Sequence, residues 1–500
     1  MKRFFAWFLA ALAIFFLFFF GLNLFDSAPA PQAPAVPPAL ELEPGNAFFM
    51  IWGFAEPPET DPLAPAYRGQ LLELFAARSR NYLFRSRYSQ WLGRLNAGYR
   101  LHWQGATIYF PQLPGEDICA YFASRRSRIA ERRNRFAVPL QRYGRILQAP
   151  VLADFTPPGW EPPARSLLLA TYTARLYAAA RAIAALDGQW LPAAGDLLAA
   201  MSAGFRLIGS GRTLPANSLG KAMLELSLRS LASLLNRPDC PPQAARLVVE
   251  NLPTRPAAAF GTAPVRNFNW VSFVGAIERV KQDGIVDPFL LKDFFRRPAA
   301  FFALERFVAI SGPRLFGTVH ALAAFFLKEN DTAAMLREYW QEVGALEGTP
   351  PWKWRLPPLL QRRSPGAPAG PFWWLRNPLG KMMVASAVPY NWPILQHYVY
   401  RSHELRVRYD LVRLLAAARL AAGAEPKLGE KTLLGLLAVG ERDPFSGAPY
   451  RFSRELGTLY SVGPDAVDDN GREQSEIWRR SDIAVPIQFV ISDSANEIKK

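Results

Sequence analysis

A long apolar run opens the chain. No charged residue interrupts the segment from Phe4 to Phe25. About 20 apolar residues are enough to cross the hydrocarbon core of a bilayer, whereas the apolar region of a secretory signal peptide has only roughly 7–15 residues. The run therefore predicts an uncleaved transmembrane signal anchor over residues 1–26, with cleavage near the small residues Ala28 and Ala30 as the alternative.

The charges on either side of this run predict its orientation. Lys2 and Arg3 precede the run, and Asp26 follows it. Because basic residues are retained on the cytoplasmic side, we expect the N-terminus in the cytoplasm and nearly all of the mass on the other side. No later segment has a comparable length without charge, so we expect a single-pass protein.

A tract rich in proline and alanine follows the apolar run over residues 27–44. Proline lacks an N–H group and fixes φ, so such a tract forms neither a helix nor a strand ladder. We interpret it as a semi-rigid linker that holds the folded part of the chain away from the bilayer.

Beyond the linker, apolar residues recur mainly at helical spacing, and Pro/Gly clusters separate the helical segments. The predicted helices are 67–95, 165–186, 191–207, 219–235, 298–310, 315–328, 332–343, 374–387 and 403–421. Strand-like segments occur only near 106–110 and within 450–490. The pattern predicts a mainly α fold. An extracytoplasmic helical domain spans 45–400, with a candidate break between subdomains near 150–165, and a C-terminal module spans 401–500.

The charge balance narrows the class of partner. The chain has 58 lysines and arginines against 42 acidic residues, a formal net charge of +16. This excess would favour nucleic acid for a cytoplasmic protein, but an exported domain does not meet nucleic acid. Anionic lipid or an acidic envelope polymer is the partner that the charge favours, with a plainly solvated surface as an equal alternative. The same two interpretations apply to the arginine cluster between Arg125 and Arg135.

One short motif occurs twice, as Asn217-Ser-Leu-Gly-Lys-Ala-Met223 and as Asn377-Pro-Leu-Gly-Lys-Met-Met383. Each copy opens an apolar segment, and asparagine is a good N-cap residue. Anion binding by the two Gly-Lys pairs at helix N-termini is one interpretation. Because the glycine spacing of a phosphate-binding loop is absent, we favour two similarly capped helices.

Catalytic motifs are missing from the sequence. None of the four histidines lies in a His-Glu-x-x-His pattern, and no Gly-x-Ser-x-Gly elbow is present. Glu116 and Asp117 precede Cys119, and acidic neighbours raise the pKa of a thiol, which disfavours a nucleophile. Cys119 and Cys240 form a candidate disulfide, with two free thiols as the alternative. We therefore assign no catalytic residue.

An acidic loop near the end of the chain offers candidate metal ligands. Asp465, Asp468 and Asp469 lie within five residues, and Asp482 follows after a polar segment. Clustered carboxylates on a flexible loop suit Ca²⁺, which takes six to eight oxygen ligands including backbone carbonyls. The alternative is a solvated acidic turn.

The C-terminal motifs resemble a known family. Asp443-Pro-Phe-Ser-Gly-Ala-Pro-Tyr, then Tyr460-Ser-Val-Gly-Pro-Asp and Ser481-Asp482-Ile, are similar to the globular half of the major pseudopilins of type II secretion systems. The resemblance implies a small α/β module with short antiparallel strands and a structural Ca²⁺. It implies side-chain ligation by Asp465 and Asp482, a carbonyl ligand from Val462, and Asp468 or Asp469 in place of the family's loop acids. The chain departs from that family because its N-terminus lacks the prepilin peptidase pattern.

The chain as a whole resembles a group of single-pass inner-membrane proteins of Gram-negative bacteria, through Asn46-Ala47-Phe48-Phe49 and Asn377-Pro-Leu-Gly-Lys. This resemblance implies a periplasmic body and no reaction. We expect a non-enzymatic structural or interaction protein of the cell envelope, with an envelope protein, anionic lipid or polymer as partner. The alternatives are an envelope-active hydrolase with a helical-bundle cleft and an accessory component of a secretion or pilus-like apparatus.

Overall fold

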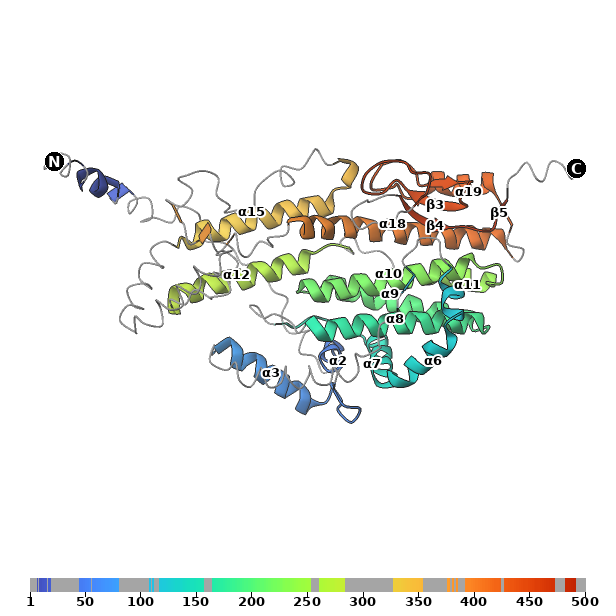
Figure 1. Cartoon of the computed structure of the whole chain (residues 1–500), viewed down its shortest axis with the longest axis horizontal. Helices are drawn as coiled ribbons and strands as arrows, with labels where there is room; N and C mark the ends of the chain where they lie inside the picture. Colours follow the sequence, from blue (N-terminus) through green and yellow to red (C-terminus); the bar gives the residue numbers. More distant parts are fainter. Residues whose placement is uncertain are drawn as a thin grey trace, which may run out of the picture. The chain divides into compact units, whose positions relative to one another are not determined.

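The structure is a computed structural model (Figure 1). It describes residues 7, 9–15, 17–18, 45–54, 56–80, 108, 110–111, 117–156, 164–252, 260–283, 327–353, 376–377, 380–381, 384, 392–423, 427–472 and 482–491. The predicted linker and the predicted helix 298–310 lie outside these residues, as do most of the predicted helices 315–328 and 374–387.

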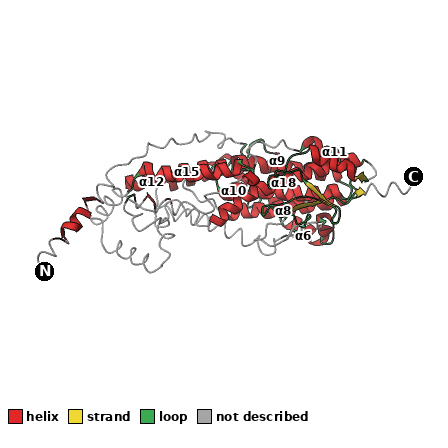
Figure 2. Cartoon of the chain, turned by 90° about the horizontal axis from the view of Figure 1, so that it is seen from above, coloured by secondary structure: helices red, strands yellow, loops and turns green. Residues whose placement is uncertain are grey.

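Helices dominate the described part of the chain, and strands are few beside them (Figure 2). The helices are α2 (Phe48–Trp52), α3 (Pro65–Arg80), α5 (Ile118–Ala123), α6 (Arg126–Arg135), α7 (Ala137–Gln148), α8 (Ala164–Leu186), α9 (Trp190–Ser210), α10 (Leu214–Asn236), α11 (Pro242–Asn251), α12 (Ala263–Asp283), α15 (Glu329–Gly348), α18 (Trp392–Ala422) and α19 (Glu430–Val439), with a short 3-10 turn at Pro351–Lys353. The mainly α prediction is confirmed.

The chain divides into two compact units. One comprises residues 1–36, 266–345 and 355–398, and the other comprises 37–265, 346–354 and 399–500. The second unit holds the large hydrophobic core, which includes residues from α2 to α11, from α18 and from the C-terminal strands. The segment after residue 399 therefore shares a core with the helical body.

Three long helices, α8, α9 and α10, form the centre of this core and lie side by side (Figure 1). Short connections join them, which favours neighbouring packing. The closest approach is between α9 and α10, where two glycines meet. A Cβ atom added to Gly220 would lie only 2.9 Å from the carbonyl oxygen of Gly204. Small residues at this crossing let the two backbones approach.

Helix α9 alone among the described helices is long and apolar enough to cross a membrane. Of its apolar window, 61% is buried inside the protein. Its hydrophobicity is therefore accounted for by the core position between α8 and α10.

Helix α10 begins earlier than predicted, because Thr213 acts as its N-cap. The Thr213 hydroxyl accepts a hydrogen bond from Ala216 N at 3.3 Å, and Pro215 follows in the first turn. Asn217 lies inside the helix, so the prediction that it caps this helix was wrong. Threonine at the cap and proline just after it are the usual start signals.

The C-terminal segment carries the strands. Strands β2 (Arg451–Ser453), β3 (Thr458–Ser461) and β4 (Ile483–Pro486) form an antiparallel sheet in the order β2-β3-β4. This confirms the predicted small antiparallel sheet. A separate parallel pair joins β1 (Leu428–Gly429) to β5 (Val490–Ile491). Gln488 N donates to Asn236 Oδ1 at 2.7 Å, which ties this segment to the end of α10.

Candidate functional site

The predicted turn at Asp443 is the organising point of the C-terminal segment. The Asp443 side chain is buried, and Oδ1 accepts hydrogen bonds from Phe445 N at 2.9 Å and Ser461 Oγ at 2.8 Å. Oδ2 accepts from Ser446 Oγ at 2.8 Å and Val462 N at 3.3 Å. One carboxylate therefore joins the turn to the end of β3. The sequence motif contained this residue, but its fourfold acceptor role depends on the tertiary fold.

Asp482 is the most distinctive of the predicted metal ligands. Its side chain is fully buried, and Oδ2 accepts a hydrogen bond from Gly471 N at 2.7 Å. Oδ1 is buried without a hydrogen-bond partner among the described residues. Burial raises the pKa of Asp482 to about 6, and the charges of Asp468 and Asp469 add to this increase. A buried carboxylate oxygen without a donor favours a proton or a cation.

The carboxylates of Asp468 and Asp465 already accept hydrogen bonds within this segment. Asp468 pairs with Arg451 and accepts a hydrogen bond from Tyr460 Oη at 3.1 Å. Asp465 is exposed and accepts from Val467 N at 3.1 Å within its own turn.

Asp469 is half-buried, and its backbone N–H donates to Asp482. The nitrogen of Val462 donates to Asp443. In the part of the chain that the structure describes, no three His, Cys, Asp or Glu side chains come together as a metal-binding group. The loop therefore brings Asp482 close to Asp468 and Asp469 without forming a side-chain cage.

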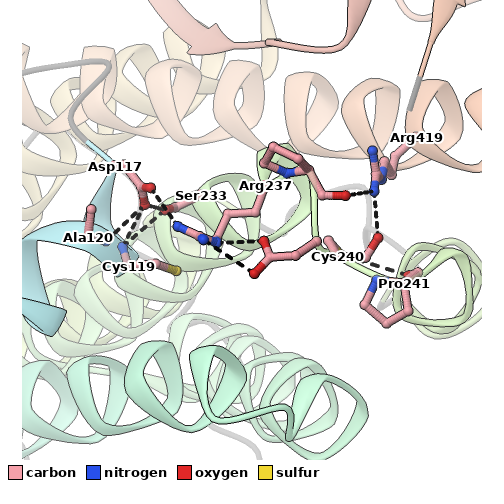
Figure 3. Close-up of polar contacts among 10 residues, drawn as sticks. Asp117, Cys119, Ala120, Ser233, Arg237, Cys240, Pro241 and Arg419 are labelled. Atoms are coloured by element: carbon pink, nitrogen blue, oxygen red, sulfur yellow. Dashed lines mark hydrogen bonds and ion pairs between the residues drawn. The ribbon is translucent and has the colours of Figure 1, made fainter. Parts of the chain in front are cut away.

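The two cysteines are both buried and both free, so the structure does not form the candidate disulfide (Figure 3). Asp117 caps α5 and accepts a hydrogen bond from Cys119 N at 2.9 Å. The Cys240 carbonyl accepts from the Arg419 guanidinium at 2.5 Å. Burial raises the pKa of the Cys119 thiol to about 12 and that of Cys240 to about 11. The backbone of each cysteine is held by its own hydrogen bonds, and the raised pKa of each thiol disfavours the thiolate form.

A layer of buried and half-buried polar and charged side chains lies between α10, α18 and the end of α15. Lys221 Nζ donates to Ser402 Oγ at 2.8 Å, and both side chains are buried. One turn away, Glu225 pairs with Arg401, which also contacts Glu404 at 3.2 Å.

Two further side chains complete the layer. The Glu347 carboxylate accepts hydrogen bonds from Thr262 N at 3.0 Å and Thr262 Oγ1 at 2.6 Å. His403 packs against Phe445, with ring centroids 6.3 Å apart.

Burial shifts the pKa values in this layer. Desolvation lowers the pKa of Lys221 to about 7, with Glu347 opposing that shift and Arg401 adding to it. Desolvation also lowers the pKa of His403 to about 4. Burial alone would raise the pKa of Glu225, but Arg401, Arg408 and Arg229 together lower it to about 2. Strongly shifted pKa values concentrated in one place are a common property of functional sites and also of structural ion-pair networks.

Sequence reasoning did not find this layer, because its members lie far apart in the chain. Lys221 and Ser402 are separated by 181 residues. The one usable signal was the Asn-x-Leu-Gly-Lys motif, which contains Lys221. In that copy, Asn217 Nδ2 donates to Ile208 O at 3.1 Å, and Gly220 permits the close helix crossing.

The second copy of the motif has a similar local role. Asn377 Oδ1 accepts hydrogen bonds from Gly380 N at 3.2 Å and from Lys328 N at 2.9 Å. Asn377 has a positive φ of 50°, which asparagine tolerates better than most residues. A Cβ atom added to Gly380 would lie 1.9 Å from Thr332 Oγ1. In both copies the asparagine side chain forms a hydrogen bond to another segment and the glycine permits close packing, which is a structural role.

Comparisons with known proteins give no relative. No family model, no curated protein and no solved structure matches the chain.

Proposed function

We propose that this chain is a membrane-anchored, extracytoplasmic structural and interaction protein of the cell envelope, with a C-terminal module stabilised by Ca²⁺. The N-terminal run supports the anchor by its length and flanking charges. Its described residues are helical, and the side chains of Trp7, Ile14 and Leu17 are exposed, as lipid-facing side chains are. Inner membrane and periplasm are the compartments that this topology favours in a Gram-negative cell.

The surroundings of the Asp482 carboxylate support the calcium part of the proposal. Its Oδ1 is buried without a donor, while two backbone N–H groups already bind the same carboxylate. The carboxylates of Asp468 and Asp469 raise its pKa, so negative charge gathers at one side of the loop. Thr458 Oγ1 is a second buried oxygen with no partner among the described residues. Calcium would take Asp482 Oδ1 with Asp469 and backbone carbonyls of the loop, because it accepts mixed oxygen ligands.

Thermal melting of the full chain in phosphatidylcholine nanodiscs tests this proposal. We expect wild-type protein to have a higher melting temperature in excess Ca²⁺ than in chelator. At a free Ca²⁺ concentration 100 times the dissociation constant, binding should add about 2.7 kcal/mol to the free energy of unfolding. Asp482→Asn should remove the dependence on Ca²⁺. In chelator this variant should be at least as stable as wild type, since a buried carboxylate without a complete set of donors is costly.

Asp465→Asn is the matched control. This exposed carboxylate is held only by its own turn, so its loss should weaken the calcium effect less than Asp482→Asn does. Equal wild-type melting curves in Ca²⁺ and in chelator would exclude the calcium site and leave a solvated acidic turn.

A hydrolase is the second candidate, and one observation favours it. The Lys221–Ser402 contact is the geometry of a serine and lysine pair, and a lysine with a pKa near 7 can be neutral at physiological pH. A neutral Lys221 would take the Ser402 proton as Oγ attacks an acyl carbon, and would return that proton to the leaving group; water would then hydrolyse the acyl-serine ester. Against this role, both side chains are about 4% exposed.

Labelling with a fluorophosphonate probe separates the two candidates. Wild-type protein labelled at Ser402, with labelling lost in Ser402→Ala and in Lys221→Met, would establish the hydrolase. We expect no labelling of the folded protein, because the probe cannot reach a buried hydroxyl. This result would assign the charged layer to the structure of the core.

A further inference from the structure

A cavity of about 770 Å³ lies between α18, α19 and the two turns that precede and follow them. Its volume lies within the range of small-molecule sites in proteins. One face of α18 provides its floor through residues spaced by about one helical turn. The floor residues are Arg406, Asp410, Arg413, Leu414 and Ala417.

The opposite wall is apolar. It is formed by Gly435, Leu436 and Val439 of α19, with Pro350 and Trp352 at the side. Val439 is 90% exposed and Trp352 is 49% exposed. The position of Trp352 is fixed by two contacts. Its backbone N–H donates to Pro444 O at 3.4 Å, and its indole ring packs against Gly447. Large apolar side chains that remain exposed around a concavity indicate a contact surface for an apolar group.

Arg406 and Arg413 provide hydrogen-bond donors of the cavity that have no acceptor among the described residues. Arg406 Nε is buried and has no hydrogen-bond partner in the part of the chain that the structure describes. Its nearest acids are Asp410 and Glu441, each 3.9 Å away. Arg413 is exposed, and no hydrogen bond or ion pair is formed by it among the described residues.

The buried acids of the lining are already bound. Asp410 accepts a hydrogen bond from Tyr450 Oη at 2.9 Å. Asp443 accepts four hydrogen bonds from its own turn and from the end of β3. The third acid of the lining, Glu441, is exposed and pairs with Arg406 at 3.9 Å. Beyond these acids, the lining offers arginine donors on one side and apolar side chains on the other.

We propose that this cavity binds a single-chain amphiphile with an anionic head group. The guanidinium groups of Arg406 and Arg413 bind the carboxylate or phosphate head, which suits their fork of donors. The alkyl chain lies along Leu414, Ala417, Leu436 and Val439. A peptide is disfavoured, because the walls are helices whose backbone groups are bonded internally and leave few partners for a second main chain.

Calorimetric titration of the full chain in phosphatidylcholine nanodiscs, with empty nanodiscs subtracted, tests the proposal. The probe is decanoate, compared with decanol, which lacks the charge, and acetate, which lacks the chain. We expect saturable binding of decanoate and at least about tenfold weaker binding of both analogues. Decyl phosphate binding more tightly than decanoate would assign the head group to the phosphate class; the reverse order would assign it to the carboxylate class.

Two variants test the two ends of the cavity. Arg406→Gln combined with Arg413→Gln should weaken decanoate binding at least about tenfold, since two charge-assisted contacts are removed. Ala417→Phe should fill the floor and abolish binding while leaving the head-group arginines in place. Arg133→Gln, on exposed α6, is the control for net charge and should leave binding unchanged.

The proposal is overturned if decanol or acetate binds as tightly as decanoate, or if Ala417→Phe binds decanoate like wild type. Binding of decanoate by the correctly folded double arginine variant with unchanged affinity overturns it as well. Circular dichroism and the melting temperature of each variant confirm that it is folded. Repeating the titration in chelator separates this result from the calcium proposal, because the cavity does not include Asp482.

Discussion

Lys221 Nζ lies 2.8 Å from Ser402 Oγ, and this contact joins α10 to α18 inside the core. Most buried amines of this kind need a carboxylate partner. For Lys221, desolvation lowers the pKa, the charge of Glu347 raises it, and the charge of Arg401 lowers it further. The resulting pKa of about 7 gives the first prediction.

Stability should depend on pH through Lys221. The folded pKa is about 7, below the ordinary value of 10.5. Between these values the unfolded chain binds more protons than the folded chain, so the Lys221 contribution to stability rises with pH from about 7 towards 10.5. Urea unfolding at pH 7, 8 and 9 should show this rise in wild type and a smaller one in Lys221→Met. Parallel pH curves for the two proteins would contradict the prediction.

The crossing of α9 and α10 should not accept a side chain. A Cβ atom at Gly220 would lie 2.9 Å from the Gly204 carbonyl oxygen and from Ile208 N. Gly220→Ala should therefore destabilise the fold by about 1–3 kcal/mol. Gly195→Ala is the control in α9, where an added Cβ meets nothing within 4 Å. That variant should be neutral or up to about 1 kcal/mol more stable, because alanine is the better helix former. Urea unfolding measures both.

Asp443 should be essential for the C-terminal segment. Asp443→Asn puts an amide group among four donors, so we expect a loss of about 2–4 kcal/mol in the free energy of unfolding. Asp465→Asn, measured in chelator, should change it by less than about 0.5 kcal/mol, because that side chain is exposed. A loss of similar size in both variants would show that the turn does not depend on the Asp443 network.

Arg142 should hold the loop that follows α2. Its guanidinium donates to the carbonyl oxygens of Gly53, Glu56, Pro57 and Thr60 at 2.7 to 2.8 Å. Lysine cannot reproduce this fork, so Arg142→Lys should lower stability by about 2–3 kcal/mol and speed hydrogen exchange over residues 53–60. Arg145→Lys, in an exposed pair with Asp61, is the control and should change neither.

Both thiols should be free yet unreactive in the native protein. Their burial and their raised pKa values predict slow reaction with a thiol reagent such as dithionitrobenzoate. In urea without reductant, two thiols per chain should react. Two thiols that appear only after reduction would establish the disulfide between Cys119 and Cys240.

Arginine use shows how far net charge alone can mislead. The +16 charge led us to consider anionic lipid or polymer as a partner. Several arginines instead bind backbone carbonyls inside the fold. Arg206 donates to Leu147 and Ala149 at the end of α7, and Arg419 donates to Pro238 and Cys240. Part of the positive charge is therefore structural, and composition could not separate it from a binding surface.

The sequence by itself determined the helical class, the small sheet at the end of the chain and the approximate position of the long helices. These follow from apolar spacing, Pro/Gly breaks and the turn chemistry at Asp443-Pro-Phe-Ser-Gly, which are all local. The start of α10 was misplaced at Asn217, because Thr213 with Pro215 is a stronger start signal than was recognised.

Only the tertiary structure decided which distant groups meet. Burial, and with it the shift in pKa, depends on the groups that surround a side chain and not on its neighbours in the chain. Lys221 meets Ser402, Asp482 Oδ1 is enclosed without a donor, and Arg406 faces a cavity formed by three separate segments. No periodicity or spacing encodes those contacts, because they arise when helices far apart in the sequence close around a common core.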